Sequence, residues 1–345
     1  KLLVPLTKEP MTRIPSAAPA VAFPSPVIHT AERNFSLRLV DGSVIDGYVR
    51  RRDPSWRVAY IATKPGPRMA PGKGRVFYGY AFIRNSQGRY QIYASNPIVI
   101  KKLRNTWHLN HPQDNVFNEI HIAQTYGDDV HIAKTYETLE DENFYYIIMP
   151  LLGADLVISQ KFFELPYPII TRQLLQNLCR LKALGILHCD ISAENVIVYA
   201  DDNDHVQCPL IDFAMARKCA TGANGRYVPI IRENSERMFG KLRYMSPEVC
   251  CGNDLSFGVD VWAIGCILFY LWTGNFLYEA PEDACWNYFV LRQNPLPRHP
   301  RVTFILTLWG QLSHTQQSLL TRIFQRQPGD RATPEELLNH PYVIY

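Results

Sequence analysis

The stretch from Ile186 to Asn195 constrains this chain more than any other feature. Asp190 is followed five residues later by Asn195, and the β-prone run V-I-V-Y of residues 196–199 comes next. A second apolar run, residues 209–211, leads directly into Asp212. Hard Mg²⁺ ions prefer oxygen ligands, and phosphoryl transfer needs a base that orients the acceptor hydroxyl. Two carboxylates and one amide in this order suit a site that holds Mg²⁺ beside a nucleoside triphosphate.

This order resembles the catalytic loop H-R-D-x-x-x-x-N and the D-F-G of eukaryotic protein kinases. Other motifs follow the order of that family over residues 71–345. They are I-V-I-K at residues 98–101, M-P-L-L at 149–152 and Y-M-S-P-E at 244–248. The resemblance implies an α+β chain with a bilobal protein kinase fold. Its N-lobe would be rich in β-strands and carry an extra N-terminal β extension, and its C-lobe would be helical.

The pattern along the chain divides it into four parts. We expect a Pro-rich arm over residues 1–30, a β extension packed on the N-lobe over 31–70, an N-lobe over 71–152 and a C-lobe over 153–345. Asp-Gly pairs at residues 41–42 and 46–47 predict hairpins. We expect a helix over 115–125, strands over 131–136 and 144–148, and helices over 169–184, 259–272, 284–293, 316–325 and 334–339. A β-rich half and a helical half indicate two lobes around a cleft.

Composition limits the partners of the chain. The net charge of +4 over 345 residues is too small to indicate nucleic-acid binding. The longest apolar run, residues 261–272, is too short to span a membrane. All eight cysteines lie between Cys179 and Cys285, which favours reduced thiols in a cytoplasmic or nuclear protein. The chain begins without Met, so the question of a targeting segment upstream of Lys1 remains open.

The strand motif ends in two lysines, Lys101 and Lys102. The resemblance makes Lys101 the residue that binds the nucleotide phosphates, oriented by an ion pair with Glu119 on the following helix. Lys102 is the alternative candidate for this role if the register of the strand differs by one residue. The simpler interpretation is that both lysines face solvent at the end of the strand. Gly72 and Gly74 offer a G-x-G for the loop that covers the phosphates.

Residues 149–152 resemble the hinge that binds adenine. Met149 and Pro150 precede Leu152, which would donate a backbone N–H, and Pro150 stands where only a carbonyl is needed. Asp155 is a candidate for the ribose hydroxyls, and it would equally serve as an N-cap for the next segment. Ile197 is expected beneath the adenine. ATP and Mg²⁺ are the cofactors that these positions imply.

In the catalytic loop, the resemblance gives Asp190 the role of accepting the proton of the substrate hydroxyl. Asn195 and Asp212 would bind Mg²⁺. His188 and Phe213 are expected to pack as part of a structural core rather than to take part in chemistry.

The Y-M-S-P-E of residues 244–248 resembles the A-P-E that ends the family's activation segment. A buried Glu248 needs a cationic partner, and Arg331 matches the arginine that supplies it. Asp260 should hold the backbone of the catalytic loop. Small-molecule phosphotransferases of related fold usually lack this platform, so it favours protein substrates. Its form favours serine and threonine over tyrosine as acceptors.

Three departures weaken the match. The glycine-rich loop is degenerate, because Phe77 stands at the third glycine position counted from Gly72. Ala214 replaces the last glycine of D-F-G, which disfavours a positive φ there. Cys189 replaces the arginine of H-R-D, which normally binds a phosphorylated activation segment. We therefore expect activity that does not depend on phosphorylation of this segment.

A fourth departure concerns two positions together. Ser192 stands where Ser/Thr kinases have a lysine that neutralises the transferring phosphate, and Lys241 stands where they have a threonine beside it. We therefore predict an exchange in which Lys241 reaches the space beside Ser192. The alternative is that Lys241 is a surface cation of a basic loop.

Taken together, the residues predict a protein serine/threonine kinase that uses ATP and Mg²⁺. The alternative is a pseudokinase, a nucleotide-binding or allosteric scaffold with the same fold. A third interpretation, compatible with either, is an interaction protein that binds a regulatory partner through the N-terminal arm and β extension.

Overall fold

The computed structural model describes residues 18–53, 57–93, 97–223, 226–231, 240–279, 283–291 and 299–344. The chain divides into two compact units. One, called here the β-rich unit, is Pro24–Gly153; the other, the helical unit, combines Lys1–Phe23 with Ala154–Tyr345. Within the described residues, no helix is long and apolar enough to cross a membrane. All eight cysteines are free thiols.

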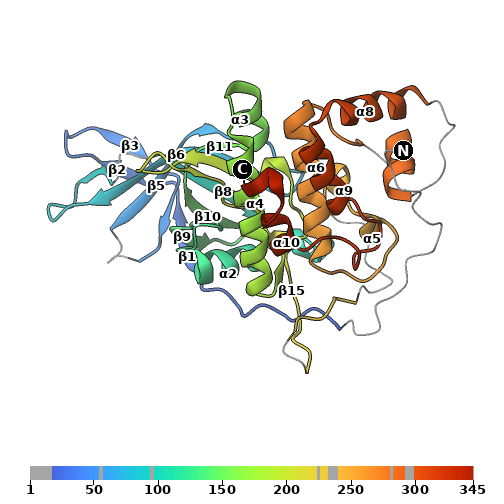
Figure 1. Ribbon diagram of the computed structural model, residues 1–345. Helices are drawn as coiled ribbons and strands as arrows, with labels where there is room; N and C mark the ends of the chain where they lie inside the picture. Colours follow the sequence, from blue (N-terminus) through green and yellow to red (C-terminus); the bar gives the residue numbers. More distant parts are fainter. Residues whose placement is uncertain are drawn as a thin grey trace. The chain divides into compact units, whose positions relative to one another are not determined.

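An eight-stranded sheet forms the β-rich unit, in the order β5-β4-β1-β9-β10-β8-β6-β7, and β5 also pairs with β6 (Figure 1). Its strands are β1 (His29–Arg33), β4 (Val49–Arg51), β5 (Val58–Pro65), β6 (Gly74–Arg84), β7 (Tyr90–Ile92), β8 (Ile98–Arg104), β9 (Glu137–Glu140) and β10 (Phe144–Pro150). Side chains alternate between the two faces of a strand. In β8, Ile98 and Ile100 therefore join a core on one face, while Leu103 packs on the other.

The predicted β extension is part of this sheet. Strand β1 pairs antiparallel with β4 and parallel with β9, where His29 stands opposite Leu139. A separate two-stranded hairpin, β2 (Ser36–Arg38) and β3 (Val44–Asp46), turns at Gly42, whose φ is 87°. The hairpin predicted at residues 41–42 is confirmed. At Gly47 the chain passes instead from the hairpin into β4 of the large sheet.

The connection between β5 and β6 spans residues 66–73. Gly72 lies in this turn with φ 85°, and Gly74 is the first residue of β6. A Cβ at Gly74 would lie 2.0 Å from the Lys102 carbonyl oxygen, so the close approach of β6 and β8 requires glycine there. The G-x-G therefore ends the turn rather than beginning it. Phe77 lies within β6, opposite Ile100.

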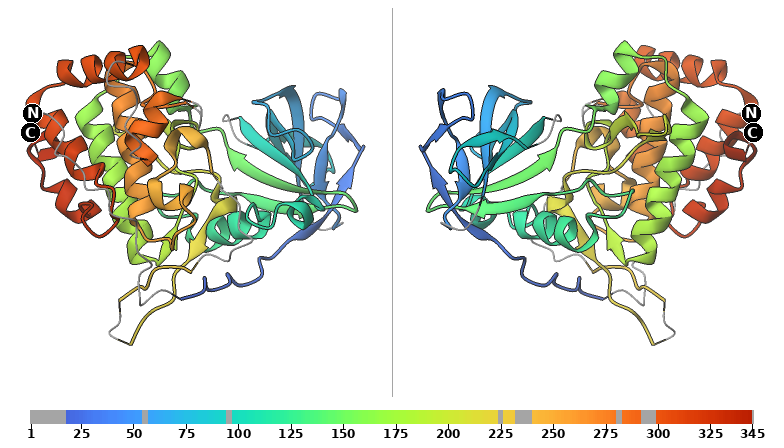
Figure 2. Two further views of the ribbon diagram at one scale, coloured as in Figure 1. Left: turned by 90° about the vertical axis from the view of Figure 1, so that its right-hand side faces the viewer. Right: turned by 90° about the vertical axis from the view of Figure 1, so that its left-hand side faces the viewer.

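Helix α2 (Val116–Tyr126) lies along one face of the sheet (Figure 2). Its N-cap is Asn115, whose side chain accepts a hydrogen bond from the Phe117 N–H. Val116 and Ile120 pack against Leu103 and Ile147 of the sheet. The helix predicted over residues 115–125 is confirmed. The short helix α1 (Trp107–Asn110), which was not predicted, precedes it.

One predicted strand is displaced. The sequence pattern indicated a strand over residues 131–136, but β9 begins at Glu137. The preceding residues form a turn instead, in which the Ile132 N–H donates to the Asp129 carbonyl at 3.1 Å. The Asp129 carboxylate also accepts from the His131 N–H at 3.1 Å. Local side-chain capping of this kind competes with strand pairing.

The helical unit is built around α6 (Gly258–Thr273), whose residues from Val259 to Leu271 are all buried. Helices α4 (Tyr167–Ala183) and α9 (His314–Ile323) pack beside it (Figure 1). The others are α3 (Leu156–Phe162), α5 (Pro247–Cys250), α7 (Ala284–Trp286), α8 (Pro300–Gln311), α10 (Pro334–Leu338) and α11 (Pro341–Ile344). A π-helical turn, η4 (Asn287–Leu291), follows α7; the predicted helix over 284–293 runs beyond it into residues outside the described part.

Short strands and 3₁₀ turns carry the loops of the helical unit. They are β11 (Ala154–Asp155), β12 (Ile186–Leu187), η1 (Ala193–Asn195), β13 (Ile197–Ala200), β14 (Val206–Gln207), η2 (Phe213–Met215), β15 (Arg217–Lys218) and η3 (Leu242–Tyr244). The described end of the predicted arm also lies on this unit. The Ala18 N–H donates to the Pro229 carbonyl at 2.7 Å, and the Val21 N–H to the Lys218 carbonyl at 2.8 Å. Residues 1–17 of the arm lie outside the described residues.

Candidate active site

Lys101 and Glu119 form a buried ion pair in the β-rich unit. The Lys101 Nζ lies 2.7 Å from both carboxylate oxygens of Glu119. The two side chains are 7% and 6% exposed, so solvent screens the pair weakly. Strand β8 supplies the lysine and helix α2 the glutamate, as predicted. A buried lysine needs such a partner, and Glu119 supplies it.

Lys102 points away from this pair. Its Nζ lies 4.0 Å from the centre of the Phe144 ring, on the face of the sheet opposite to that of Lys101. The pKa of Lys102 is lowered, first by desolvation and then by the nearby Arg33 guanidinium. Glu119 therefore pairs with Lys101 and not with Lys102, as the predicted register requires.

The residues predicted to bind the nucleotide base lie at strand ends of their own units. Met149 and Pro150 end strand β10, opposite Val99 and Ile98 of β8. Leu152 follows in the chain. In the helical unit, Asp155 of β11 stands opposite Ile197 of β13.

Asp155 is an N-cap in this structure. Its carboxylate oxygen Oδ1 accepts a hydrogen bond from the Ile158 N–H at 2.9 Å, at the start of α3. This is the second of the two roles that the sequence left open. A capping bond occupies one lone-pair direction of one oxygen, so it does not by itself exclude a ribose contact.

The Asp190 carboxylate is held from two sides. Its Oδ2 accepts from the Asn195 Nδ2 at 3.0 Å, and its Oδ1 accepts from the Lys241 N–H at 3.2 Å. Asn195 also donates to the Asp190 carbonyl at 2.8 Å, which closes the loop between the two residues. The geometry fixes the direction of a carboxylate that can accept a proton.

Lys241 reaches Ser192, as predicted. Its Nζ donates to the Ser192 Oγ at 2.6 Å and lies 3.4 Å from the Asn195 Oδ1. The Ser192 residue is fully buried, and the Lys241 side chain is 38% exposed. A cation therefore occupies the space that Ser192 leaves open. The contact is confirmed, while its role in catalysis stays a prediction.

Glu194 is a residue that the sequence analysis did not single out. Its Oε2 lies 3.6 Å from the Lys241 Nζ and accepts a hydrogen bond from the Tyr244 hydroxyl at 3.1 Å. It thus helps to hold the lysine above the loop. Its place directly before Asn195 was the available signal, because η1 brings neighbouring side chains of the loop together.

The donors predicted for Mg²⁺ come from neighbouring segments of the helical unit. The Ile211 N–H donates to the Asn195 carbonyl at 3.0 Å, and Asp212 follows immediately. Asp212 has a left-handed backbone, with φ 63° and ψ 65°. One amide oxygen and one carboxylate are the hard donors that Mg²⁺ takes, so the residues fit the ion. Among the described residues, no cluster of three His, Cys, Asp or Glu offers another metal site.

The catalytic loop rests on buried side chains. Asp260 accepts hydrogen bonds from the backbone N–H groups of His188 and Cys189, at 2.8 and 2.9 Å, which confirms its predicted role. The His188 ring lies 4.5 Å from the Phe213 ring, and burial lowers the pKa of His188 to about 4. The histidine is therefore neutral near pH 7 and packs as predicted. Burial raises the pKa of Asp260 to about 6.

The two substitutions near this loop have different consequences. Ala214 is buried within the 3₁₀ turn η2, and its φ is not positive, so alanine fits without strain. Cys189 does have a positive φ, of 64°. Its thiol pKa is raised well above the usual value, mainly by desolvation, so the side chain is neutral.

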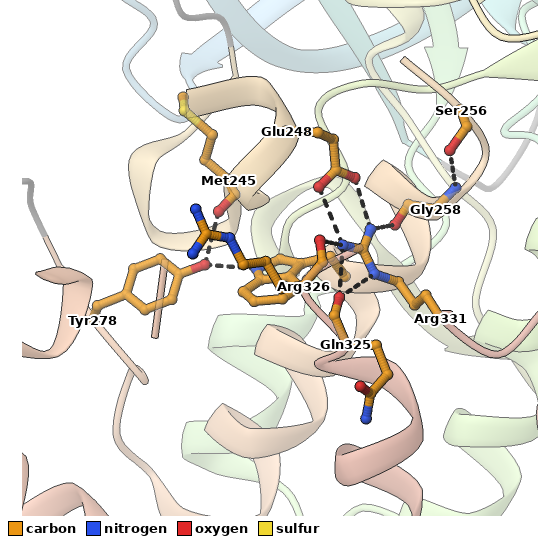
Figure 3. Close-up of polar contacts among 9 residues, drawn as sticks. Met245, Glu248, Ser256, Gly258, Tyr278, Gln325, Arg326 and Arg331 are labelled. Carbon is orange, nitrogen blue, oxygen red and sulfur yellow. Dashed lines mark hydrogen bonds and ion pairs between the residues drawn. The ribbon is translucent and has the colours of Figure 1, made fainter. Parts of the chain in front are cut away.

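A buried ion pair supports the platform after the loop (Figure 3). Arg331 donates from Nη1 to the Glu248 Oε1 at 2.7 Å and from Nη2 to Oε2 at 3.1 Å, as predicted. Both side chains are fully buried. The Tyr278 hydroxyl donates to the Met245 carbonyl at 2.9 Å, so the Y-M-S-P-E segment is also fixed at its second residue.

Comparison with known proteins shows which families and proteins the chain is similar to. The model of the protein kinase domain matches residues 88–343. Serine/threonine-protein kinase DCLK3 of Mus musculus is 26% identical over 239 residues, which cover 67% of this chain and 28% of that protein. Serine/threonine-protein kinase PEPKR2 of Arabidopsis thaliana is 23% identical over 239 residues, which cover 68% of this chain and 46% of that protein.

Serine/threonine-protein kinase PLK4 of Nematostella vectensis is 26% identical over 216 residues, which cover 60% of this chain and 19% of that protein. The chain thus spans less than half the length of these relatives. The domain match, by contrast, covers most of the chain. Together with the motifs described above, it shows that the chain belongs to the eukaryotic protein kinase superfamily.

Proposed function

We propose that this protein transfers the γ-phosphoryl group of ATP to serine or threonine side chains of proteins, with Mg²⁺ as cofactor. The observation that carries the proposal is the environment of Asp190. The Asp190 carboxylate is fixed by Asn195 and by the Lys241 backbone, and the Lys241 ammonium group contacts Ser192 of the same loop as Asp190, so two segments bring a base and a cation to one loop. Phosphoryl transfer is catalysed chiefly by such positioning and charge.

Each residue has a separate role in the proposal. Asp190 orients the substrate hydroxyl and accepts its proton, and Lys241 stabilises charge on the transferring group. Asn195 and Asp212 would hold Mg²⁺, which when bound neutralises charge on the phosphates. In the β-rich unit, Lys101 binds phosphate and is positioned by Glu119. Gly72 and Gly74 would lie near the phosphates, and the backbone of residues 149–152 would bind adenine.

A protein substrate is supported by the platform that follows the loop, because the buried Arg331–Glu248 ion pair holds the Y-M-S-P-E segment in place. The relatives named above are serine/threonine-protein kinases, which supports the same acceptor class. A cytoplasmic or nuclear location remains part of this proposal.

The first experiment measures transfer of radiolabelled phosphate from ATP to a generic basic protein. We expect the wild type to be active, and Asp190→Asn to lose activity by about 10²- to 10⁴-fold. The same Mg²⁺-dependent thermal shift with ATP in both proteins would show that the variant is folded and still binds nucleotide.

Two other results would count against the proposal. No phosphate transfer, combined with a Mg²⁺-dependent thermal shift on addition of ATP, would support the pseudokinase alternative. Equal transfer by the wild type and by Asp190→Asn would mean that a contaminating kinase produces the signal, and the proposal would lose its support.

A further inference from the structure

Cationic side chains gather around Phe144 in the β-rich unit, at one end of strands β6, β8 and β10. Arg104 stands opposite Phe144, and Arg75 stands opposite Lys102, so the side chains share one face of the sheet. The Lys102 Nζ lies 4.0 Å from the Phe144 ring centre, and the guanidinium carbons of Arg104 and Arg33 lie 5.8 and 5.9 Å from it. We call these residues, with Tyr48, the Phe144 cluster.

The positive charge of this cluster is only partly balanced. The carboxylate placed against it is Asp141, which binds the Arg33 Nε at 2.7 Å and accepts from the Tyr146 hydroxyl at 2.6 Å. Arg75, Lys102 and Arg104 form no salt bridge with any described residue. Arg75 and Arg104 are exposed. Four cations therefore face one carboxylate, that of Asp141, which already binds Arg33 and Tyr146.

Two groups within the cluster favour a bound anion: the Tyr48 hydroxyl, whose oxygen is buried, and the half-buried Lys102. The Tyr48 hydroxyl is buried and has no hydrogen-bond partner among the described residues, which is costly for a polar group. Its ring lies 5.6 Å from the Lys102 Nζ. Desolvation, followed by the charge of Arg33, lowers the pKa of Lys102. A bound anion would relieve that repulsion and could accept from the Tyr48 hydroxyl.

We propose that the Phe144 cluster binds the phosphorylated side chain of a peptide segment. A phosphoryl group carries a charge near −2 and several acceptor oxygens, which suits two or more guanidinium forks and a phenol donor. A carboxylate would bring only one charge. Arg75 and Arg104 are exposed at the edge of the cluster, where a free ion would gain little enclosure. The attached peptide supplies the extra contact, and the partly buried Phe144 ring offers an apolar surface for it.

The test is fluorescence anisotropy with the whole chain and a labelled seven-residue peptide, a central phosphoserine flanked by alanines. We expect this peptide to bind at least tenfold more tightly than the same peptide with serine. The Arg75→Gln/Arg104→Gln variant should bind the phosphopeptide at least tenfold more weakly. The control Arg38→Gln/Lys134→Gln removes two exposed cations elsewhere in the same unit, and it should change the affinity by less than twofold.

A second variant tests the buried hydroxyl without altering charge. Tyr48→Phe should weaken phosphopeptide binding severalfold while leaving the melting temperature equal or higher, because it removes an unpartnered polar atom. Asp190→Asn should bind the phosphopeptide as the wild type does, which separates this site from the proposed catalytic loop.

Three results would overturn the proposal. They are equal binding of the serine and phosphoserine peptides, unchanged affinity in Arg75→Gln/Arg104→Gln, and competition by inorganic phosphate at the same concentration as by unlabelled phosphopeptide. The last result would identify a free anion, rather than a peptide, as the occupant.

Discussion

Lys241 lies against Ser192, which is the contact that the predicted exchange of roles requires. The Lys241 side chain extends from the N-cap of η3 to the Ser192 hydroxyl at 2.6 Å, and Glu194 at 3.6 Å holds it from the other side. The Lys241 backbone N–H also donates to Asp190, so in the proposed mechanism one residue would both orient the base and supply the cation. The Lys241 side chain is 38% exposed, as the alternative of a surface cation expects, but its ammonium group is held by Ser192.

The first prediction concerns Lys241→Met. This variant retains most of the aliphatic chain and loses the charge, so we expect kcat to fall by about 10²- to 10³-fold. The KM for ATP should change little, because the lost interaction belongs to the transition state. Steady-state kinetics measures both values.

The matched control for Lys241→Met is Arg243→Gln, which removes another cation of the same loop. Arg243 is 40% exposed and pairs with Glu279, so its loss should alter kcat by less than twofold. Undiminished turnover in Lys241→Met would disprove the exchange of roles.

At the residue scale, the sequence predicted side chains that have an obligatory partner. Lys101 with Glu119, and Glu248 with Arg331, could be paired in advance because an unpaired buried charge is costly and the resemblance to protein kinases implies which residue is the partner. The sequence could not decide between the two roles of Asp155, ribose contact and N-cap, since capping depends on where α3 begins. The unpartnered Tyr48 hydroxyl could not be foreseen either, because it depends on which strands surround it.

At the scale of elements, a second ion pair joins the β5–β6 turn to the segment before α2. The Lys73 Nζ lies 2.8 Å from the Asp114 Oδ2, and that oxygen also accepts from the Trp107 Nε1 at 2.9 Å. The Lys73 and Asp114 side chains are 12% and 9% exposed. Helix α2 carries Glu119, so this pair fixes the turn to the same part of the chain that positions the Lys101 partner.

We predict that Lys73→Met destabilises the protein by about 3 kcal/mol, because it leaves the Asp114 carboxylate buried without a cation. Adding Asp114→Asn in the same chain should recover part of this loss, since a neutral amide oxygen can still accept from Trp107. Urea unfolding of the wild type, both single variants and the double variant gives the coupling energy. Strictly additive effects would contradict a direct pair.

Element boundaries depended on interactions that a linear pattern does not contain. The start of β9 at Glu137 rather than near residue 131 reflects the turn capped by Asp129. Helix α8 was not predicted, although Val302, Ile305 and Trp309 bury one face at helical spacing. Its many Thr, Val and Ile residues have low helix propensity, and packing overrides that preference.

At the scale of the whole molecule, the least predictable feature is the path of the first strands. Residues of β1 pair in parallel with β9, more than a hundred positions later in the chain, as His29 does with Leu139. Strand β1 was not predicted, since its first two residues fall in the part of the chain assigned to the arm. Hydrophobic alternation in any case says nothing about which distant strand a strand joins. The loop motifs were predictable because their chemistry fixes residue types at short spacing.

The last prediction is that removing all phosphate leaves the activity of the protein unchanged, which rests on the proposed function. An arginine before the catalytic aspartate could bind a phosphorylated activation segment, but Cys189 has a neutral, desolvated thiol. The cation that acts on this thiol, Arg217, donates from Nη1 to the carbonyls of Met215 and Ala216 at 2.9 and 3.3 Å. Turnover should therefore stay within twofold after treatment with a broad-specificity phosphatase, with complete removal checked by intact mass. A kinase that requires such phosphorylation, treated in parallel, should lose its activity, and a matching loss here would show that another cation takes the place of the missing arginine.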